Sequence, residues 1–242
     1  MNDKIRLKNN LVLNVISSLF RYNLKIIFAN KFIYFLLAAV IIFLLVTTIN
    51  LLDSDSNPTE GTVYYLLIVP GLLVIFYPTV FGIQNDVDAR IIEILFGIPN
   101  YRYKVWLVRM VIIYFVVFGI LIILSLLSSF ALVNVPVFKM VFQLMSPIFF
   151  VGSLAFMLST IVRNGNGTAV FIIIILMAFW ITSEPLTASK WNLFLNPFKV
   201  PSNVNEAVWA ETTFLNRIYL WVGTGFTMLF GLLFLQKREK FV

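Results

Sequence analysis

The chain has 242 residues, of which 60% are apolar and only 12% are charged, and its formal net charge is +7. Soluble globular domains contain about 25% charged residues, so this composition excludes a water-soluble fold and predicts a membrane protein. The absence of cysteine and histidine removes disulfides, thiol nucleophiles, imidazole bases and the ordinary zinc, copper and haem ligand sets.

The first predicted element is an amphipathic helix over residues 11–31. Asn14, Arg21 and Lys25 recur at helical spacing, and apolar residues cover the rest of the surface. This pattern predicts a helix that lies in the inner membrane interface, either as a simple anchor or as an elbow that positions the first span against a cytoplasmic partner. Because no small-residue cleavage site follows, we expect no removable signal peptide.

Six apolar stretches are predicted to be transmembrane helices, and together they form one transmembrane domain over residues 1–242. A helix needs about 20 mainly apolar residues to cross a bilayer, and the fifth stretch only just reaches this length. The expected fold is an all-α bundle with six spans: Phe32–Leu52, Thr62–Gln84, Val105–Val133, Met140–Val162, Gly167–Ser183 and Ile218–Gln236.

The loop 85–104, here called the coupling segment, predicts a second amphipathic helix. Asp86, Arg90 and Glu93 are spaced by four and three residues, which gives one charged face. Apolar residues form the opposite face: Val87, Ile91, Ile94 and Leu95. A short helix joined stiffly to two spans suits the transmission of force from a soluble protein, although the same apolar face also suits a helix resting on lipid head groups.

The last part of the chain contains an aromatic segment, 184–217, followed by the sixth predicted span. Tryptophan and phenylalanine side chains stand among prolines and polar residues in this segment, as in an aromatic belt at a membrane interface. Gly223, Thr227 and Gly231 recur every four residues in the span and predict a close helix approach, either within the chain or between two chains.

The distribution of basic residues predicts the orientation in the cell membrane. Lys and Arg concentrate in short cytoplasmic loops, and both termini are therefore expected in the cytoplasm. The basic residues lie at membrane edges and not in one soluble patch, so we expect no nucleic-acid partner. Of the 18 basic residues, all but four fall on the predicted cytoplasmic side, the four being Lys139, Lys190, Lys199 and Arg217.

The predicted spans lack ionisable residues apart from Arg109, and Gln143 is their main strongly polar residue. Ion-coupled carriers usually bind the driving ion through buried carboxylates, basic groups or unwound polar segments. The chain also lacks a Gly-rich phosphate loop with its lysine. Uphill transport would therefore need ATP hydrolysed by another chain. The alternatives are a secondary carrier or channel that works without ATP, a membrane-embedded enzyme and a structural scaffold.

The sequence from Glu93 to Arg102 reads EILFGIPNYR, and Lys104 and Arg109 follow at the entrance of the third span. This run resembles the second-loop signature of the type-two ABC transporter permeases, in which a Glu-Leu-Leu run leads to a proline, a basic residue and a Lys or Arg that opens the third helix. The layout is similar too, with an elbow helix, six spans, a long outer loop and a basic tail. Arg90 is a departure, because many members carry glycine three residues before the motif's glutamate.

The resemblance implies a permease subunit that pairs with a second permease chain, a copy or a related one, and with two cytoplasmic ABC ATPase subunits. ATP and Mg would bind the ATPase chains, and this chain would hold no catalytic residue, cofactor or metal. The uncharged, Phe-rich interior favours export of an apolar or amphipathic cargo, such as a lipid, lipopeptide or hydrophobic peptide.

The resemblance also assigns roles to individual residues. The ATPase would dock on Asp86, Arg90, Ile91, Glu93, Ile94 and Leu95. Arg102, Lys104 and Arg109 would lie near the inner head groups. In this family the region before the last span forms short helices that dip into the outer leaflet and close the exit of the pathway, and the candidates for such an outer gate are Trp191, Phe194 and Phe198.

Overall fold

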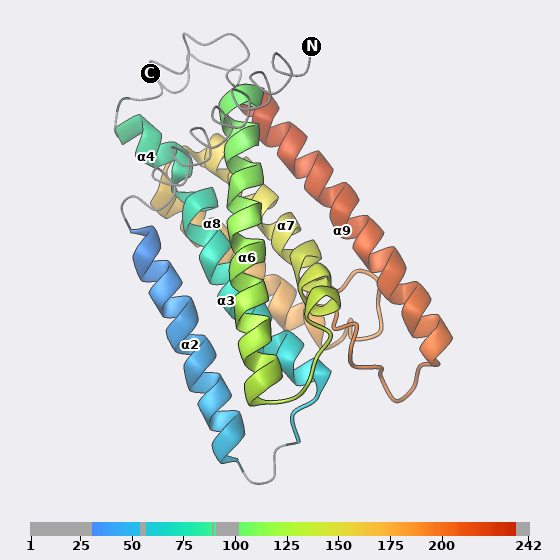
Figure 1. Cartoon of the computed structure of the whole chain (residues 1–242). Helices are drawn as coiled ribbons and strands as arrows, with labels where there is room; N and C mark the ends of the chain where they lie inside the picture. Colours follow the sequence, from blue (N-terminus) through green and yellow to red (C-terminus); the bar gives the residue numbers. More distant parts are fainter. Residues whose placement is uncertain (1–30, 54–56, 89, 91–101, 236–242) are drawn as a thin grey trace, which may run out of the picture.

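The structure is a computed structural model and describes residues 31–53, 57–88, 90 and 102–235 (Figure 1). The predicted elbow helix, except Lys31, lies outside the described residues. The same holds for motif residues 91–101, including Glu93, and for the basic C-terminal tail from Gln236 onwards. These three predictions stay predictions.

The described residues form helices and no strands, and six helices are long and apolar enough to cross a membrane. Helix α3 continues past Phe81 into α4, and a π-helical turn, η1, leads into α6. The elements are α2 (Phe32–Leu52), α3 (Glu60–Val80), α4 (Gly82–Asp88), η1 (Arg102–Leu107), α6 (Val108–Ala131), α7 (Val137–Val162), α8 (Gly165–Ser183) and α9 (Glu206–Phe234). The prediction of a multi-pass all-α membrane protein is confirmed.

Different connections of the chain lie at the two ends of the bundle (Figure 1). Residues 53 and 57–59 and the connections 132–136 and 184–205 lie at one end, here called the loop end. Residue 31, both described edges of the coupling segment, the 163–164 connection and residue 235 lie at the opposite end, here called the terminal end.

Short polar side chains set the beginnings of several helices. Thr59 and Thr62 form a capping box at the start of α3, in which each hydroxyl accepts the other residue's backbone N–H at 3.3 Å. Asn164 caps α8, since its Oδ1 accepts two backbone N–H groups of the first turn at 2.9 and 3.1 Å. Arg163 ends α7 in the left-handed conformation with φ of 58°, so two residues suffice to join α7 to α8.

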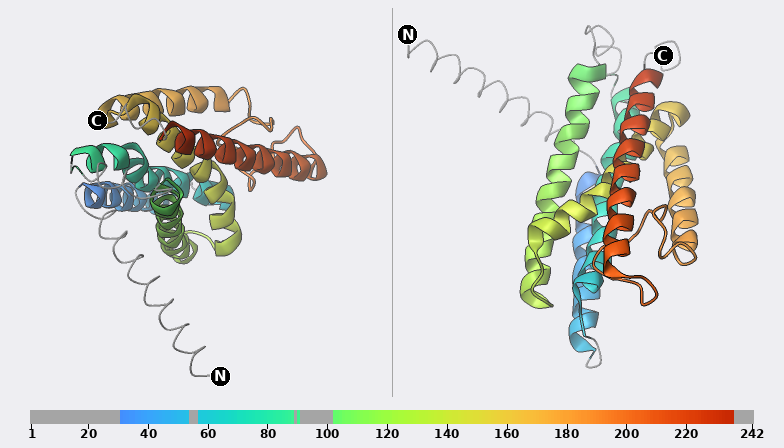
Figure 2. Two further views of the ribbon diagram at one scale, coloured as in Figure 1. Left: turned by 90° about the horizontal axis from the view of Figure 1, so that it is seen from above. Right: turned by 90° about the vertical axis from the view of Figure 1, so that its right-hand side faces the viewer.

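Helices α3 and α7 form the interior of the bundle. Helix α7 packs against α9, α3, α6 and α8, while α2 packs mainly on α3. Figure 2 shows α7 running obliquely through the bundle, with α2 and α9 on opposite sides. Helices α2, α8 and α9 bury little of their surface and expose large apolar side chains. Such surfaces suit contact with lipid tails, which are as apolar as leucine.

The stripe of small residues on α9 packs against α7 within the chain. Thr227 shares a hydrogen bond of 2.7 Å with Ser153. A Cβ atom at Gly223 or at Gly231 would lie 2.8 Å from a phenylalanine ring carbon of α7. These contacts decide between the two alternatives left by the sequence, because the close approach is made between two helices of the same chain.

Helix α9 begins at Glu206, twelve residues before the predicted span, so the prediction of an outer loop over 184–217 is wrong in its second part. The sequence prediction began this span after Arg217 because an ionisable residue was taken to lie outside the membrane. Here Asn205 caps the helix, with its Oδ1 accepting the N–H of Ala207 at 3.0 Å, while Glu206 is exposed in the first turn. The connection 184–205 contains turns and no helix, so the short helices expected there are absent.

Candidate functional site

The start of the coupling segment is joined by a buried ion pair to α6, the helix that follows the segment. Arg109, in the first turn of α6, donates from Nη1 to Oδ2 of Asp86 on α4 at 2.8 Å. Both side chains are buried, with 5% and 3% exposed. The Arg109 guanidinium also lies 4.5 Å from the centroid of the Trp106 ring, a distance at which a cation and an aromatic face attract each other. The ion pair therefore fixes α4 to the start of α6.

This geometry changes the predicted charged face of the coupling segment. Helix α4 ends at Asp88, and Arg90 has φ of 54°, so no continuous helix runs through Asp86 and Arg90. Asp86 is buried against Arg109, while Arg90 is exposed. An exposed docking surface that includes the Asp86 carboxylate is therefore corrected to a buried contact within the bundle. Likewise, Arg109 points to a carboxylate and not to lipid head groups.

The structure describes some of the other residues predicted to act in or beside this segment. Arg102 and Lys104 lie in the π-helical turn η1 that precedes α6. Ile91, Glu93, Ile94 and Leu95 lie outside the described residues. Beside this segment, a pocket of about 960 Å³ opens between α2, α3, α4 and the start of α8. Its wall combines aromatic and polar side chains: Lys31, Tyr34, Phe35, Tyr77, Phe81, Gln84, Asn85, Asp88 and Asn166.

At the loop end a second buried arginine, Arg217 of α9, holds four neutral groups. Its Nε donates to Oε1 of Gln143 at 2.7 Å, and its Nη1 donates to Oδ1 of Asn216 at 2.7 Å. Its Nη2 donates to the Leu195 carbonyl at 3.2 Å and to the Tyr64 hydroxyl at 3.4 Å. Among the described residues no carboxylate forms an ion pair with it. Arg217 thus joins α3, α7 and α9 to the segment 184–205.

Three asparagines fix the path of the segment 184–205. Asn216 donates to the carbonyls of Lys190 and Asn192 at 2.8 and 2.9 Å. Asn192 accepts the N–H of the residue two positions on at 2.9 Å. Asn196 accepts a backbone N–H in the same way at 3.0 Å and donates to the Gly61 carbonyl at 2.9 Å. An irregular segment is stable here because its backbone groups are satisfied by side chains.

The three outer gate candidates occupy different environments. Trp191 is 60% exposed and stacks on Tyr219 with ring centroids 4.6 Å apart. Phe194 is buried and meets Trp180 edge to face at 5.6 Å. Phe198 lies beside Tyr64 at 6.1 Å. The three side chains therefore do not form one cluster. The structure has two pockets at the loop end, and of these three residues only Phe194 lines the larger one.

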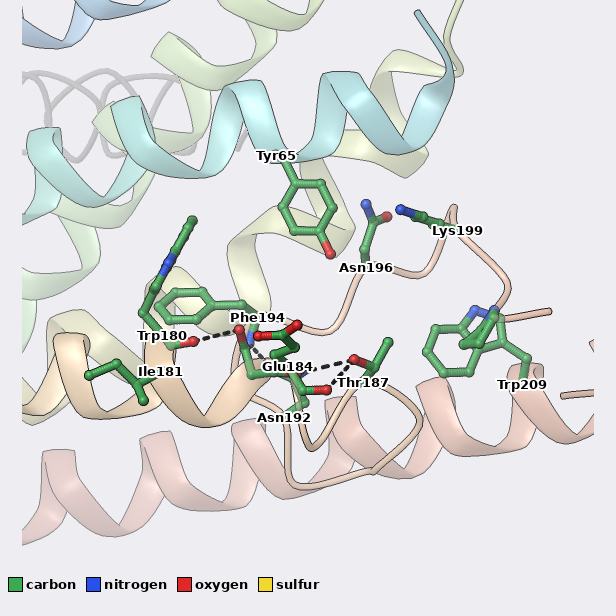
Figure 3. Close-up of a pocket in the computed structure, with 12 residues that line it drawn as sticks. Tyr65, Trp180, Ile181, Glu184, Thr187, Asn192, Phe194, Asn196, Lys199 and Trp209 are labelled. Carbon is green, nitrogen blue, oxygen red and sulfur yellow. Dashed lines mark hydrogen bonds between the residues drawn. The ribbon is translucent and has the colours of Figure 1, made fainter. Parts of the chain in front are cut away.

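That pocket, here called the loop-end pocket, has a volume of about 670 Å³ and opens beside α8 (Figure 3). Aromatic rings, one carboxylate and one ammonium group line it. Its wall consists of Tyr65, Trp180, Ile181, Ser183, Glu184, Thr187, Asn192, Phe194, Asn196, Lys199, Pro201 and Trp209. A neighbouring pocket of about 630 Å³ between α2 and α3 shares Tyr65 and Lys199 with it.

Sequence reasoning missed the loop-end residues that the fold brings together. Arg217 was counted only as one of four basic residues on the outer side, and Trp209 only as one of the aromatic residues of the segment 184–217. Tyr65 and the Glu184 side chain were not singled out. One signal was present: Asn216 and Arg217 immediately precede an apolar run, and polar residues in such a place need partners inside the protein.

No metal centre is evident in the described ranges, since no three Asp or Glu side chains converge there. The polar sites described above are an ion pair at one end of the bundle and a hydrogen-bonded arginine beside an aromatic pocket at the other. Comparisons of the chain with protein-family models, with curated proteins and with solved structures found no match.

Proposed function

We propose that this chain is the membrane-spanning permease subunit of an ATP-driven transporter of the type-two ABC exporter kind. A separate cytoplasmic ATPase would dock on the coupling segment at the terminal end. The observation that carries the proposal is the buried Asp86–Arg109 ion pair, which ties the start of that segment to the helix that follows it.

The ion pair supports a role in transmitting force. Separating a buried pair leaves an uncompensated charge in a medium of low dielectric constant, which costs about 3–5 kcal/mol. A displacement of the coupling segment would therefore move α4 and α6 together, since the ion pair joins these two elements. Helix α4 continues α3, and α3 and α6 both pack against α7, so the movement would reach the centre of the bundle.

The packing of the bundle favours a pathway between two permease chains. Large side chains fill the interior, among them Tyr64, Leu67, Ile75, Met110 and Phe156. The described pockets of more than 600 Å³ lie near its two ends. An apolar or amphipathic cargo would then enter beside the pocket at the terminal end and move along surfaces shared with a second permease chain, which is a copy of this chain or a related one.

The charges inside the bundle favour ATP over an ion gradient as the energy source. In the described spans Asp86 is the buried carboxylate, and Arg109 already neutralises it. Arg217 is held by neutral groups. Neither site offers a free carboxylate for a driving ion, which secondary carriers usually need.

The test is whether an ATPase binds the coupling segment. The tagged full-length chain is purified from its own cells in mild detergent, and nucleotide-binding partners are labelled with a photoreactive ATP analogue. We expect a labelled ATPase that is lost from the Arg90→Glu, Glu93→Arg double variant. The control is Asn166→Asp, which introduces a negative charge at an exposed residue of the same end outside the coupling segment.

Two outcomes would contradict the proposal. One is equal recovery of the ATPase with the double variant and the control. The other is transport of a fluorescent phospholipid by liposomes that contain this chain alone and no ATP, which would favour a carrier or channel.

A further inference from the structure

We propose that the loop-end pocket binds the head group of a phospholipid that carries both a phosphate and an ammonium group, such as phosphatidylethanolamine or phosphatidylcholine. The inference requires only that the chain lies in a bilayer. It therefore stands or falls separately from the proposed coupling to an ATPase.

The pocket wall includes polar groups that have no partner among the described residues, among them the Glu184 carboxylate, the Lys199 ammonium and the Trp209 indole N–H. Trp209 is the most informative, because it is only 4% exposed and its Nε1 atom is buried without an acceptor. A buried donor left unpaired destabilises the fold, because it loses its hydrogen bond to water without gaining another. A ligand oxygen in the pocket would satisfy it.

Two asparagines, one serine and one threonine of the wall are engaged with the backbone. Asn192 and Asn196 each accept a backbone N–H and donate to a backbone carbonyl. Ser183 and Thr187 donate to carbonyls of the preceding turn. These residues shape the pocket, while Glu184, Lys199 and Trp209 offer a ligand a negative group, a positive group and a buried neutral donor.

The positions of these groups match a zwitterion. Figure 3 shows Trp180 and Phe194 on one side of the pocket, Lys199 and Trp209 on the opposite side, and Glu184 with Tyr65 between them. A phosphate fits beside the Lys199 ammonium and the Trp209 N–H. An ammonium group fits beside Glu184, because aromatic faces and a carboxylate both attract a cation.

The surface of α8 argues for a lipid over a soluble zwitterion. Ile174, Met177 and Ile181 follow one another at spacings of three and four residues, so they form a stripe on one face of the helix. Their side chains are 57%, 58% and 70% exposed. Ile181 also lines the pocket. A lipid whose head group fills the pocket would therefore lay its hydrocarbon chains along this stripe. The pocket volume of about 670 Å³ is in the usual range for small-ligand sites.

The test is native mass spectrometry of the intact, delipidated chain titrated with phosphatidylcholine, phosphatidylethanolamine and phosphatidylglycerol of identical acyl chains. We expect the two zwitterionic lipids to bind about tenfold more tightly than phosphatidylglycerol, a difference of about 1.4 kcal/mol. Glu184→Gln should remove this preference, and Glu184→Lys should invert it in favour of phosphatidylglycerol. The matched control, Glu211→Gln, changes an exposed carboxylate at the same end that does not line the pocket.

A second variant tests the phosphate side without altering the shape of the wall. Trp209→Phe keeps an aromatic ring but removes the N–H, so it should weaken all three lipids by about three- to tenfold. Thermal unfolding midpoints equal to wild type would show that each variant is folded.

Equal binding of the three lipids by the wild type, or a preference that survives Glu184→Lys, would overturn the proposal. Soluble phosphocholine supplies the last arm, because it has the head group without the chains. If it displaced phosphatidylcholine at the lipid's own concentration, the α8 stripe would contribute nothing and the assignment to a lipid would fail.

Discussion

The two buried arginines, Arg109 at the terminal end and Arg217 at the loop end, keep their charges inside the bundle by opposite means. A carboxylate 2.8 Å away neutralises Arg109, and a tryptophan ring covers its guanidinium. Arg217 instead donates hydrogen bonds to four uncharged groups from three helices and one irregular segment.

The difference matters because the loss of one residue should lower the free energy of unfolding by different amounts in the two arrangements. An ion pair is made by two residues alone, so removing either one leaves the other as a buried, unpaired charge. A neutral network shares its energy among many groups, and the loss of one donor is smaller. The terminal end is therefore a rigid junction between α4 and α6, whereas the loop end holds a segment that single changes would loosen.

The largest expected effect is that of Asp86→Asn. This variant leaves the Arg109 charge buried without a counter-charge, and the free energy of unfolding should fall by about 3–5 kcal/mol. Reversible unfolding in mixed micelles, followed by tryptophan fluorescence, measures the loss.

The control for Asp86→Asn is the double variant Asp86→Leu, Arg109→Met, which replaces both charges by apolar side chains. Replacing a whole buried ion pair in this way is often neutral or stabilising, so the double variant should unfold close to the wild type. If it lost as much stability as the single variant, the contact would be important for its packing and not for its charges.

An intermediate effect is expected for Arg217→Gln. The variant loses the planar fork that reaches four acceptors, and several buried acceptors lose a donor. It also removes a charge that has no described counter-charge, which offsets part of the cost. We expect a loss of about 1–3 kcal/mol together with faster hydrogen exchange in the segment 184–205.

Arg217→Lys tests whether charge or geometry matters at this position. Lysine keeps the charge but places its donors at one point on a flexible stem, so it should be no more stable than the glutamine variant. Lys190→Gln, at the same end, is the matched control for removing a basic residue. If Arg217→Gln lowered the free energy of unfolding as much as Asp86→Asn, the proposed difference between the two ends would be contradicted.

Hydropathy predicted the fold well because the bilayer imposes it. Every backbone polar group in the hydrocarbon must be satisfied within its own segment, so long apolar runs become helices. The first span was predicted with the bounds that the structure has, Phe32–Leu52, and most others differ by a few residues. The sixth was predicted too short because Arg217 was treated as its beginning, although buried hydrogen bonds accommodate this arginine inside the helix.

The sites were less predictable because they depend on distant partners. Helical spacing suggested that Asp86 faces Arg90, but Asp86 instead pairs with a residue 23 positions away. Likewise, Trp209, Glu184 and Tyr65 come from three elements, and only the fold brings them to one pocket. Local periodicity reports the faces of one helix and contains no information on such contacts.

The smallest expected effect concerns Arg90, the residue that departs from the pattern of the resembled family. Its φ of 54° is a conformation that costs an ordinary residue about 1–2 kcal/mol but is open to glycine. Arg90→Gly should therefore raise the free energy of unfolding relative to Arg90→Ala by up to about 1 kcal/mol, since the greater freedom of glycine in the unfolded chain offsets part of the gain. Both variants remove the side chain, so both should weaken ATPase docking equally. Equal stability of the two variants would show that Arg90 does not hold this backbone conformation, and the terminal end would then lack the turn that separates α4 from the rest of the coupling segment.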